Sequence, residues 1–91
     1  MMKIYPFFTF FLIANSLIIS QTQNFNGVVI DKDNGKPLVG VNIIGSDFGT
    51  SSNEFGEFSL EAEKNSTALF KYVGFDSVVQ KLDKNMSVFL N

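Results

Sequence analysis

Residues 38–60 join short runs of alternating apolar residues to turn signals at regular intervals, and this rhythm constrains the fold more than any other feature of the chain. Phe58, Leu60 and, just beyond, Ala62 alternate with polar residues. That two-residue period is typical of a strand with one face in a core and the other in water. Asn-Glu-Phe-Gly at 53–56 has the residue preferences of a type I turn. The pattern predicts a sheet protein.

The rest of the chain continues this pattern. Asn34-Gly35 is a strong turn signal because both residues tolerate positive φ. Pro37 cannot donate to a sheet and is expected before a strand or on an edge. No segment of ten or more residues beyond residue 20 has apolar residues at helical spacing. About six or seven short strands, with polar breaks roughly every 8–12 residues, predict an all-β sandwich or partial barrel. The expected strands cover residues 25–31, 39–44, 49–52, 57–62, 67–73, 75–82 and 86–90.

The N-terminus has the build of a secretory signal, with Lys3 followed by an apolar run over residues 7–19. A transmembrane helix needs roughly 20 predominantly apolar residues. The run is shorter, so cleavage is preferred, and an uncleaved anchor is the alternative. Ser20 is small enough to precede the cut. Residues 1–20 are therefore predicted to be a signal peptide and residues 21–91 the exported domain, placed in the periplasm, at the outer membrane or outside the cell.

The exported domain would carry six lysines, no arginine and nine carboxylates, a net charge of −3. Nucleic acids are bound through clustered cations that displace counterions from phosphates. The lysines are scattered among acids, so no nucleic-acid partner is expected. For the same reason no direct binding to anionic lipid is expected after signal cleavage. The expected partner is a protein or a cell-surface glycan.

The chain has no cysteine, so disulfides cannot stabilise it as they stabilise many small exported domains. A domain near 60 residues buries only about 60% of its unfolded surface. Large aromatic side chains, each burying roughly 150–250 Å², are the expected source of stability. They are interpreted as core, and an aromatic ligand-binding face is the alternative. The aromatic residues are Phe25, Phe48, Phe55, Phe58, Phe70, Tyr72, Phe75 and Phe89.

The chain also has no histidine, so the commonest metal ligands and nucleophile–base pairs are missing. The candidates for the paired carboxylates of a glycosidase are Glu54, Glu57, Glu61 and Glu63. Strand alternation places most of them on a wet face, whereas a general acid is a buried carboxyl group. No catalytic residue and no cofactor is therefore predicted, and the chain is not expected to be an enzyme.

Two glycine-containing segments resemble binding loops only in part. Residues 31–35 have oxygen side chains before a glycine, but a calcium loop has its glycine one place later and a glutamate where Asn42 stands. A solvated turn is the preferred interpretation, and a weak surface calcium site is left open. Gly45, Gly49 and Gly56 are interpreted as turn glycines, because a phosphate loop leads into a helix and a strand is expected after Gly56.

Several motifs carry a resemblance to a known family. They read Gly27-x-Val29-x-Asp31, Gly35-x-Pro37-Leu38-x-Gly40-Val41-x-Ile43-x-Gly45, Gly49-Thr50-x-Ser52-Asn53-x-x-Gly56-x-Phe58-x-Leu60 and Phe70-Lys71-Tyr72-Val73-Gly74-Phe75. The chain resembles the carboxypeptidase regulatory-like domain of exported Bacteroidetes proteins, which also stands at the N-terminus of TonB-dependent outer-membrane receptors. The similarity covers residues 24–91. It implies a transthyretin-like Greek-key β-sandwich without catalytic residues, in which Gly49-Thr50 cross between the sheets and residues 53–56 close a hairpin.

Three functions follow as hypotheses. The first is a non-catalytic exported module that acts through protein or glycan contacts, including addition of a neighbour's strand to an open sheet edge. The second is an N-terminal fragment of a TonB-dependent receptor that takes part in nutrient uptake. The third is a carbohydrate-binding module that uses Phe48 and Phe55, two aromatic residues expected to be exposed in turns.

Overall fold

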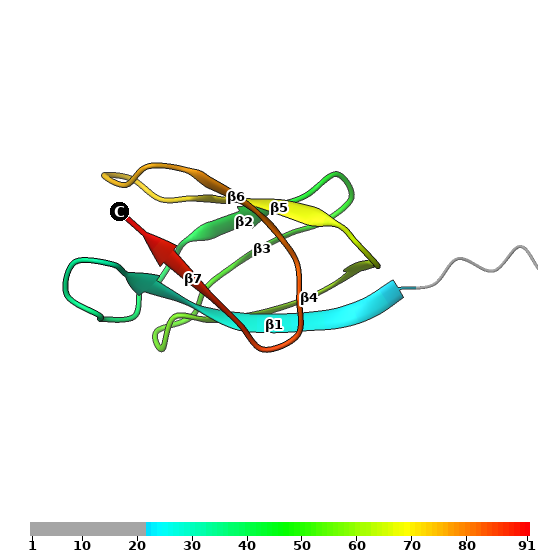
Figure 1. Cartoon of the computed structure of the whole chain (residues 1–91), viewed down its shortest axis with the longest axis horizontal. Coiled ribbons are helices and arrows are strands. Elements are labelled where there is room, and N and C mark those ends of the chain that lie inside the picture. Colours follow the sequence, from blue (N-terminus) through cyan, green and yellow to red (C-terminus); the bar gives the residue numbers. More distant parts are fainter. Residues whose placement is uncertain (1–21) are drawn as a thin grey trace, which may run out of the picture.

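Seven strands and no helix make up residues 22–91, the part of the chain that the computed structural model describes (Figure 1). The predicted signal peptide and its cleavage site lie outside these residues. No helix that could span a membrane is found in residues 22–91. The strands are β1 (Thr22–Asp31), β2 (Asn42–Ile44), β3 (Gly49–Ser51), β4 (Glu57–Glu63), β5 (Thr67–Lys71), β6 (Val78–Lys81) and β7 (Met86–Leu90).

The strands form two sheets packed face to face, one in the order β4-β1-β7 and the other in the order β3-β2-β5-β6 (Figure 1). The chain crosses between the sheets after β1, β3, β4 and β6. β1 and β7 run parallel, and all other pairs of these strands are antiparallel. This architecture confirms the predicted all-β sandwich.

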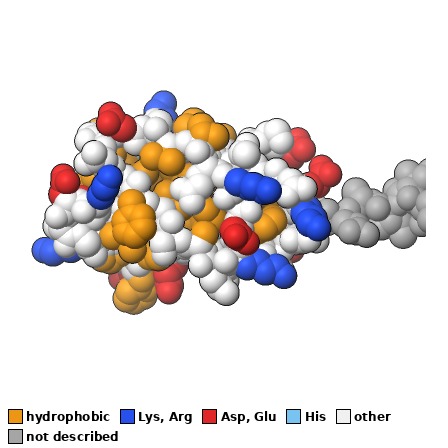
Figure 2. Space-filling model, viewed as in Figure 1, with side chains coloured by type: hydrophobic (Ala, Val, Ile, Leu, Met, Phe, Trp, Pro, Cys, Tyr) orange, Lys and Arg blue, Asp and Glu red, His pale blue; other side chains and the backbone are white. Residues whose placement is uncertain are grey.

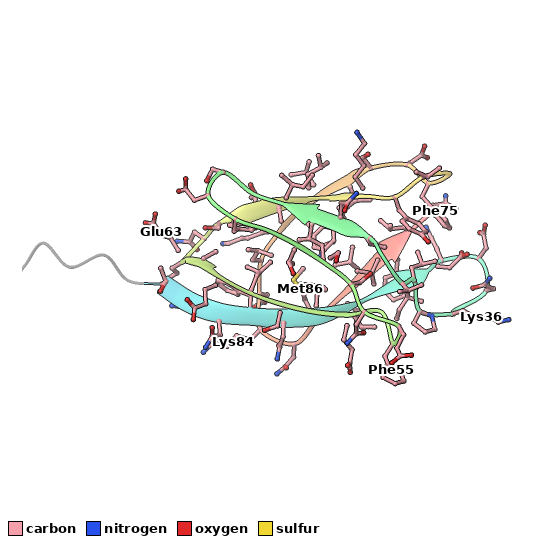
Figure 3. All side chains as sticks on the ribbon, turned by 180° about the vertical axis from the view of Figure 1, so that it is seen from behind. Lys36, Phe55, Glu63, Phe75, Lys84 and Met86 are labelled. Atoms are coloured by element: carbon pink, nitrogen blue, oxygen red, sulfur yellow. The ribbon has the colours of Figure 1, made fainter. Side chains whose placement is uncertain are left out.

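Alternation along the strands creates the core, as the sequence predicted. In β4, Phe58, Leu60 and Ala62 are buried, whereas the residues between them are exposed. β7 behaves in the same way, and Figure 3 shows its first residue, Met86, pointing between the sheets. The deepest layer holds six side chains with less than 2% of their surface exposed: Phe70, Ile43, Leu90, Val29, Val41 and Val88.

The aromatic residues divide between core and surface. Phe58 of β4 and Phe70 of β5 meet edge to face with ring centroids 5.5 Å apart, so this contact joins the two sheets. Phe25 is also buried, and Tyr72, Phe75 and Phe48 pack on the core while partly exposed.

Phe55 and Phe89 are 63% and 53% exposed, so the interpretation of every aromatic residue as core was wrong for these two. Figure 2 shows part of the hydrophobic surface that results.

The predicted crossing at Gly49-Thr50 was wrong. Both residues lie in β3, which pairs with β2 of the same sheet through Ile44↔Gly49 and Ile43↔Thr50. The chain crosses after β3, along residues 52–56. These residues therefore connect the two sheets and do not close a hairpin. A turn signal shows where a chain bends, but the sheet that the next strand joins depends on long-range pairing.

The turn inside this crossing has the predicted local form. The side-chain Oδ1 of Asn53 accepts hydrogen bonds from the backbone N–H of Phe55 and of Glu57, both at 2.9 Å. The N–H of Gly56 donates to the carbonyl of Asn53 at 2.8 Å, and Gly56 has φ +75°. An asparagine cap and a glycine with positive φ thus make the bend.

Residues 31–37 also form the predicted turn. The Asp31 carboxylate accepts a hydrogen bond from the N–H of Asp33, and the Asn34 side chain accepts one from the N–H of Lys36. Gly35 has φ +73°, and Pro37 makes an isolated bridge to Ile30 at the edge of the sheet, as expected for a residue without an N–H. The carboxylate of Asp31 and the side-chain amide oxygen of Asn34 therefore both accept hydrogen bonds from the backbone of the turn itself.

Candidate interaction surfaces

The two aromatic residues proposed as a binding pair lie at opposite ends of β3. Phe55 follows β3 in the crossing turn, and Figure 3 shows it pointing away from the sandwich. Phe48 precedes β3 and is half-buried against the core. Its ring covers Gly45, where an added Cβ would collide with ring atoms of Phe48. The two rings therefore do not form one platform, and a contact role for either ring stays a prediction.

The four glutamates considered as candidates for a glycosidase pair are all exposed. Glu57, Glu61 and Glu63 follow the outer face of β4, and Glu54 lies in the turn before it. In the described chain, residues 22–91, no three Asp or Glu side chains are grouped so that they could hold a metal ion. The acidic residues make a negatively charged strip on one edge strand. This arrangement can attract cations but does not enclose a substrate.

A polar hollow of about 680 Å³ crosses β4, β1 and β7. Its lining is rich in side-chain amides and hydroxyls, contributed by Asn26, Ser51, Asn53, Ser59, Asn85 and Ser87. Glu57 adds a carboxylate, and the Asn26 side chain accepts a hydrogen bond from the N–H of Asn85 at 3.0 Å. Hydrogen-bond donors and acceptors of this kind suit the hydroxyl groups of a sugar.

Gly27, in the wall of this hollow, permits the close approach of β1 and β7. A Cβ on Gly27 would collide with the backbone carbonyl of Met86 and would lie 2.9 Å from the ring of Phe58. Gly27 lies inside β1 and does not have a positive φ. The sequence signal for close packing was therefore only that a glycine stands within an expected strand.

A second hollow lies at the β6–β7 seam, which is the side of the sandwich where β6 and β7 are the outer strands of their sheets. It has a volume of about 560 Å³ and is lined by Lys32, Asp76, Val78, Phe89 and Asn91. The N–H of Asp76 donates to the carbonyl of Asn91 at 2.9 Å and closes one end of the seam. On the face shown in Figure 2, hydrophobic side chains gather over β6 and β7.

The outer face of the sheet β3-β2-β5-β6 carries an apolar row. Ile44 pairs with Leu69, and Leu69 pairs with Val79, so three aliphatic side chains lie next to one another across β2, β5 and β6. Ile44 and Val79 are 46% and 69% exposed. Lys71 and Lys81 flank the row on the same face, because they are two residues from Leu69 and Val79 along their strands.

Comparison with known proteins agrees with the resemblance read from the sequence. The CarboxypepD_reg-like domain family matches residues 25–90. The chain is also 34% identical over 88 residues to TonB-dependent receptor P3 of Formosa agariphila. The aligned region is 91% of this chain and 9% of that receptor, so the chain spans less than a tenth of the relative's length. Both findings confirm the predicted relationship.

Proposed function

Because this chain belongs to the CarboxypepD_reg-like domain family, we propose that it is an exported, non-catalytic β-sandwich domain that binds proteins and serves TonB-dependent uptake at the outer membrane. The observation that carries this proposal is the similarity of almost the whole chain to a small part of a TonB-dependent receptor. A region that makes up 9% of a receptor has the size of an accessory domain.

The roles of the residues that carry the family resemblance support a binding role without catalysis. Gly35 and Gly56 adopt positive φ in turns, Pro37 bridges the sheet edge, and Asn53 caps the crossing turn. Gly27 allows two strands to approach closely. These residues shape turns and close strand contacts, and three of them are glycines, which have no side chain to act on a substrate. The surface between them is free to present contacts.

The proposal has two forms, in which the domain is one part of a longer receptor or a separate copy that works beside one. Genomic sequence beyond codon 91 distinguishes them. An in-frame or frameshifted continuation with the patterns of a receptor plug and barrel would favour the first form. A different gene immediately downstream would favour the second.

Cross-linking in the native host tests the proposal itself. The protein, tagged at its C-terminus and expressed with its own N-terminus, is expected in the cell-envelope fraction, with cross-links to a TonB-dependent receptor. Recovery of the intact protein from the cytoplasm alone would contradict the proposal. Hydrolysis of peptide or glycoside substrates by the purified protein would also contradict the proposal. The control is a matched preparation of the core variant Leu60→Ala, which must lose that activity together with its fold.

A second candidate function is glycan binding at the polar hollow. The amides and hydroxyls gathered there favour it, although Phe48 and Phe55 lie outside the lining. A glycan array tests it with Ser59→Ala and Glu57→Gln, which alter exposed lining residues. Binding that these variants weaken, and that Phe55→Ala leaves unchanged, would place the sugar in the hollow. Absence of binding by the unmodified protein would end this candidate.

A further inference from the structure

The edge strands of the two sheets differ in how well they are protected against pairing with another strand. Proteins commonly protect open edges with charged residues or very short strands. β4 carries Glu57, Glu61 and Glu63, β6 ends with Lys81, and β3 is only three residues long. β3 and β4 also lie beside each other on the far side of the sandwich. β7 has five residues, Met-Ser-Val-Phe-Leu, with no charge and no proline.

The backbone groups on the open edge of β7 can be identified from one hydrogen bond and the alternation of the strand. The N–H of Lys32 donates to the carbonyl of Leu90 at 2.9 Å, so Leu90 turns its backbone groups toward β1. Alternation gives Met86 and Val88 the same direction and turns Ser87 and Phe89 the opposite way. Within residues 22–91, β7 pairs with no strand other than β1. Ser87 and Phe89 therefore present N–H and C=O groups at the open edge. The carbonyl of Asn91, the next residue with this direction, accepts a hydrogen bond from the N–H of Asp76, so the open stretch ends at Phe89.

We propose that β7 pairs antiparallel with β7 of a second copy of this chain, which makes a two-fold dimer. Ser87 of each copy lies opposite Phe89 of the other, and both residues have backbone groups directed at the joint, so the pairing is self-complementary. The dimer would contain a continuous six-stranded sheet, because each copy contributes the three strands of β4-β1-β7. This inference goes beyond the proposed function and does not depend on the receptor relationship.

The distribution of charge supports a second copy as the occupant. Antiparallel pairing brings the start of one β7 close to the end of the other. Asp83 and Lys84 precede β7, while Lys32 and Asp76 lie beside its end, so each end of the joint would combine both signs of charge. The acidic strand β4 is the far strand of each sheet, which separates the two negative strips. The exposed ring of Phe89 would be covered by the partner.

The joint is short, and this limits its strength. Stable interfaces bury roughly 1,200–2,000 Å² in total, and a pair of five-residue strands buries less. We therefore expect a weak dimer with a dissociation constant in the range of roughly 1 µM to 1 mM.

Sedimentation of the purified exported protein over that concentration range tests the proposal. Phe89→Lys places a charge at the joint and is expected to raise the dissociation constant by at least about tenfold. Val79→Lys is the matched control, since Val79 is an exposed apolar residue on the other edge strand of the seam, and it should leave the dimer unchanged. Circular dichroism and melting temperature establish that both variants fold.

The register has its own test, because the chain contains no cysteine. Paired residues in an antiparallel ladder have Cα atoms about 5.5 Å apart, which suits a disulfide. Copies with Ser87→Cys mixed with copies with Phe89→Cys should form mixed disulfides faster than either variant alone. The proposal would be overturned by a monomer over the whole concentration range, by a dimer that Val79→Lys removes and Phe89→Lys does not, or by disulfides without preference for the mixed pair. A protein that dimerises at no concentration but sediments as a complex with an added extended peptide of foreign sequence would also overturn the proposal, in favour of a different occupant.

Discussion

Ser52 and Val41 are joined by two hydrogen bonds that hold the entry to β2 against the end of β3. The N–H of Val41 donates to the hydroxyl oxygen of Ser52 at 2.9 Å, and the N–H of Ser52 donates to the carbonyl of Val41 at 3.1 Å. The same hydroxyl donates to the carbonyl of Leu38 at 2.6 Å. Ser52 is the one buried polar side chain in residues 22–91, with 4% of its surface exposed.

Ser52→Ala should lower the free energy of unfolding by about 1–3 kcal/mol, because it leaves a buried N–H and a carbonyl without their partner. Ser59→Ala is the control, since Ser59 is exposed on β4 and its loss should change stability by no more than about 0.5 kcal/mol. Urea unfolding measures both. Equal midpoints for the two variants would show that the hydroxyl of Ser52 does not hold this junction.

Alanine substitutions at Gly56 and Gly35 distinguish the cost of backbone strain from the cost of steric collision. Both have positive φ, +75° and +73°, but only Gly56 is enclosed. A Cβ at Gly56 would lie 2.7 Å from the carbonyl oxygen of Val29 and 2.8 Å from the Cβ of Pro37, whereas a Cβ at Gly35 has no atom within 4 Å. Gly35→Ala should cost about 1–2 kcal/mol and Gly56→Ala about 2–5 kcal/mol. Thermal unfolding that ranks Gly35→Ala as the worse variant would refute this account of the crossing turn.

Leu60→Ala tests the register of β4. Leu60 faces the core with 8% of its surface exposed, and truncation should cost roughly 2–5 kcal/mol, which is a large share of the stability of a small domain. Its neighbour Glu61 points into solvent, so Glu61→Ala should remain within about 0.5 kcal/mol of the parent. If calorimetry gave the larger loss to Glu61→Ala, the two faces of β4 would have been exchanged.

Substitution of Phe48 should lower the stability of the protein more than substitution of Phe55, because the two side chains differ in burial. Phe48→Ala removes a ring that packs on the core and on Gly45, and should cost about 1–3 kcal/mol. Phe55→Ala removes a side chain that is 63% exposed and should change stability by no more than about 0.5 kcal/mol. Chemical unfolding of the two variants compares them directly. A greater loss at Phe55 would place its ring against the sandwich and contradict the structure.

The order of strands and turns could be predicted from local pattern, since strand periodicity and turn preference are properties of neighbouring residues. The inward positions of Phe58 and Leu60, the capped turn at Asn53 and the edge position of Pro37 followed from such patterns and are confirmed. The resemblance to the family also depended on the spacing of these residues.

The assignment of strands to sheets depended on tertiary packing. The family resemblance implied a crossing at Gly49-Thr50, but β3 stays beside β2, and the chain crosses after β3, where the Ser52 hydroxyl accepts from the N–H of Val41. The close approach at Gly27 and the separation of Phe48 from Phe55 likewise needed the folded chain. Edge addition could be predicted in general terms, but β7 became the candidate edge only when its neighbours were known. The physical reason is that each strand has two edges and two faces, and only contacts between residues far apart in the sequence decide which of them are covered.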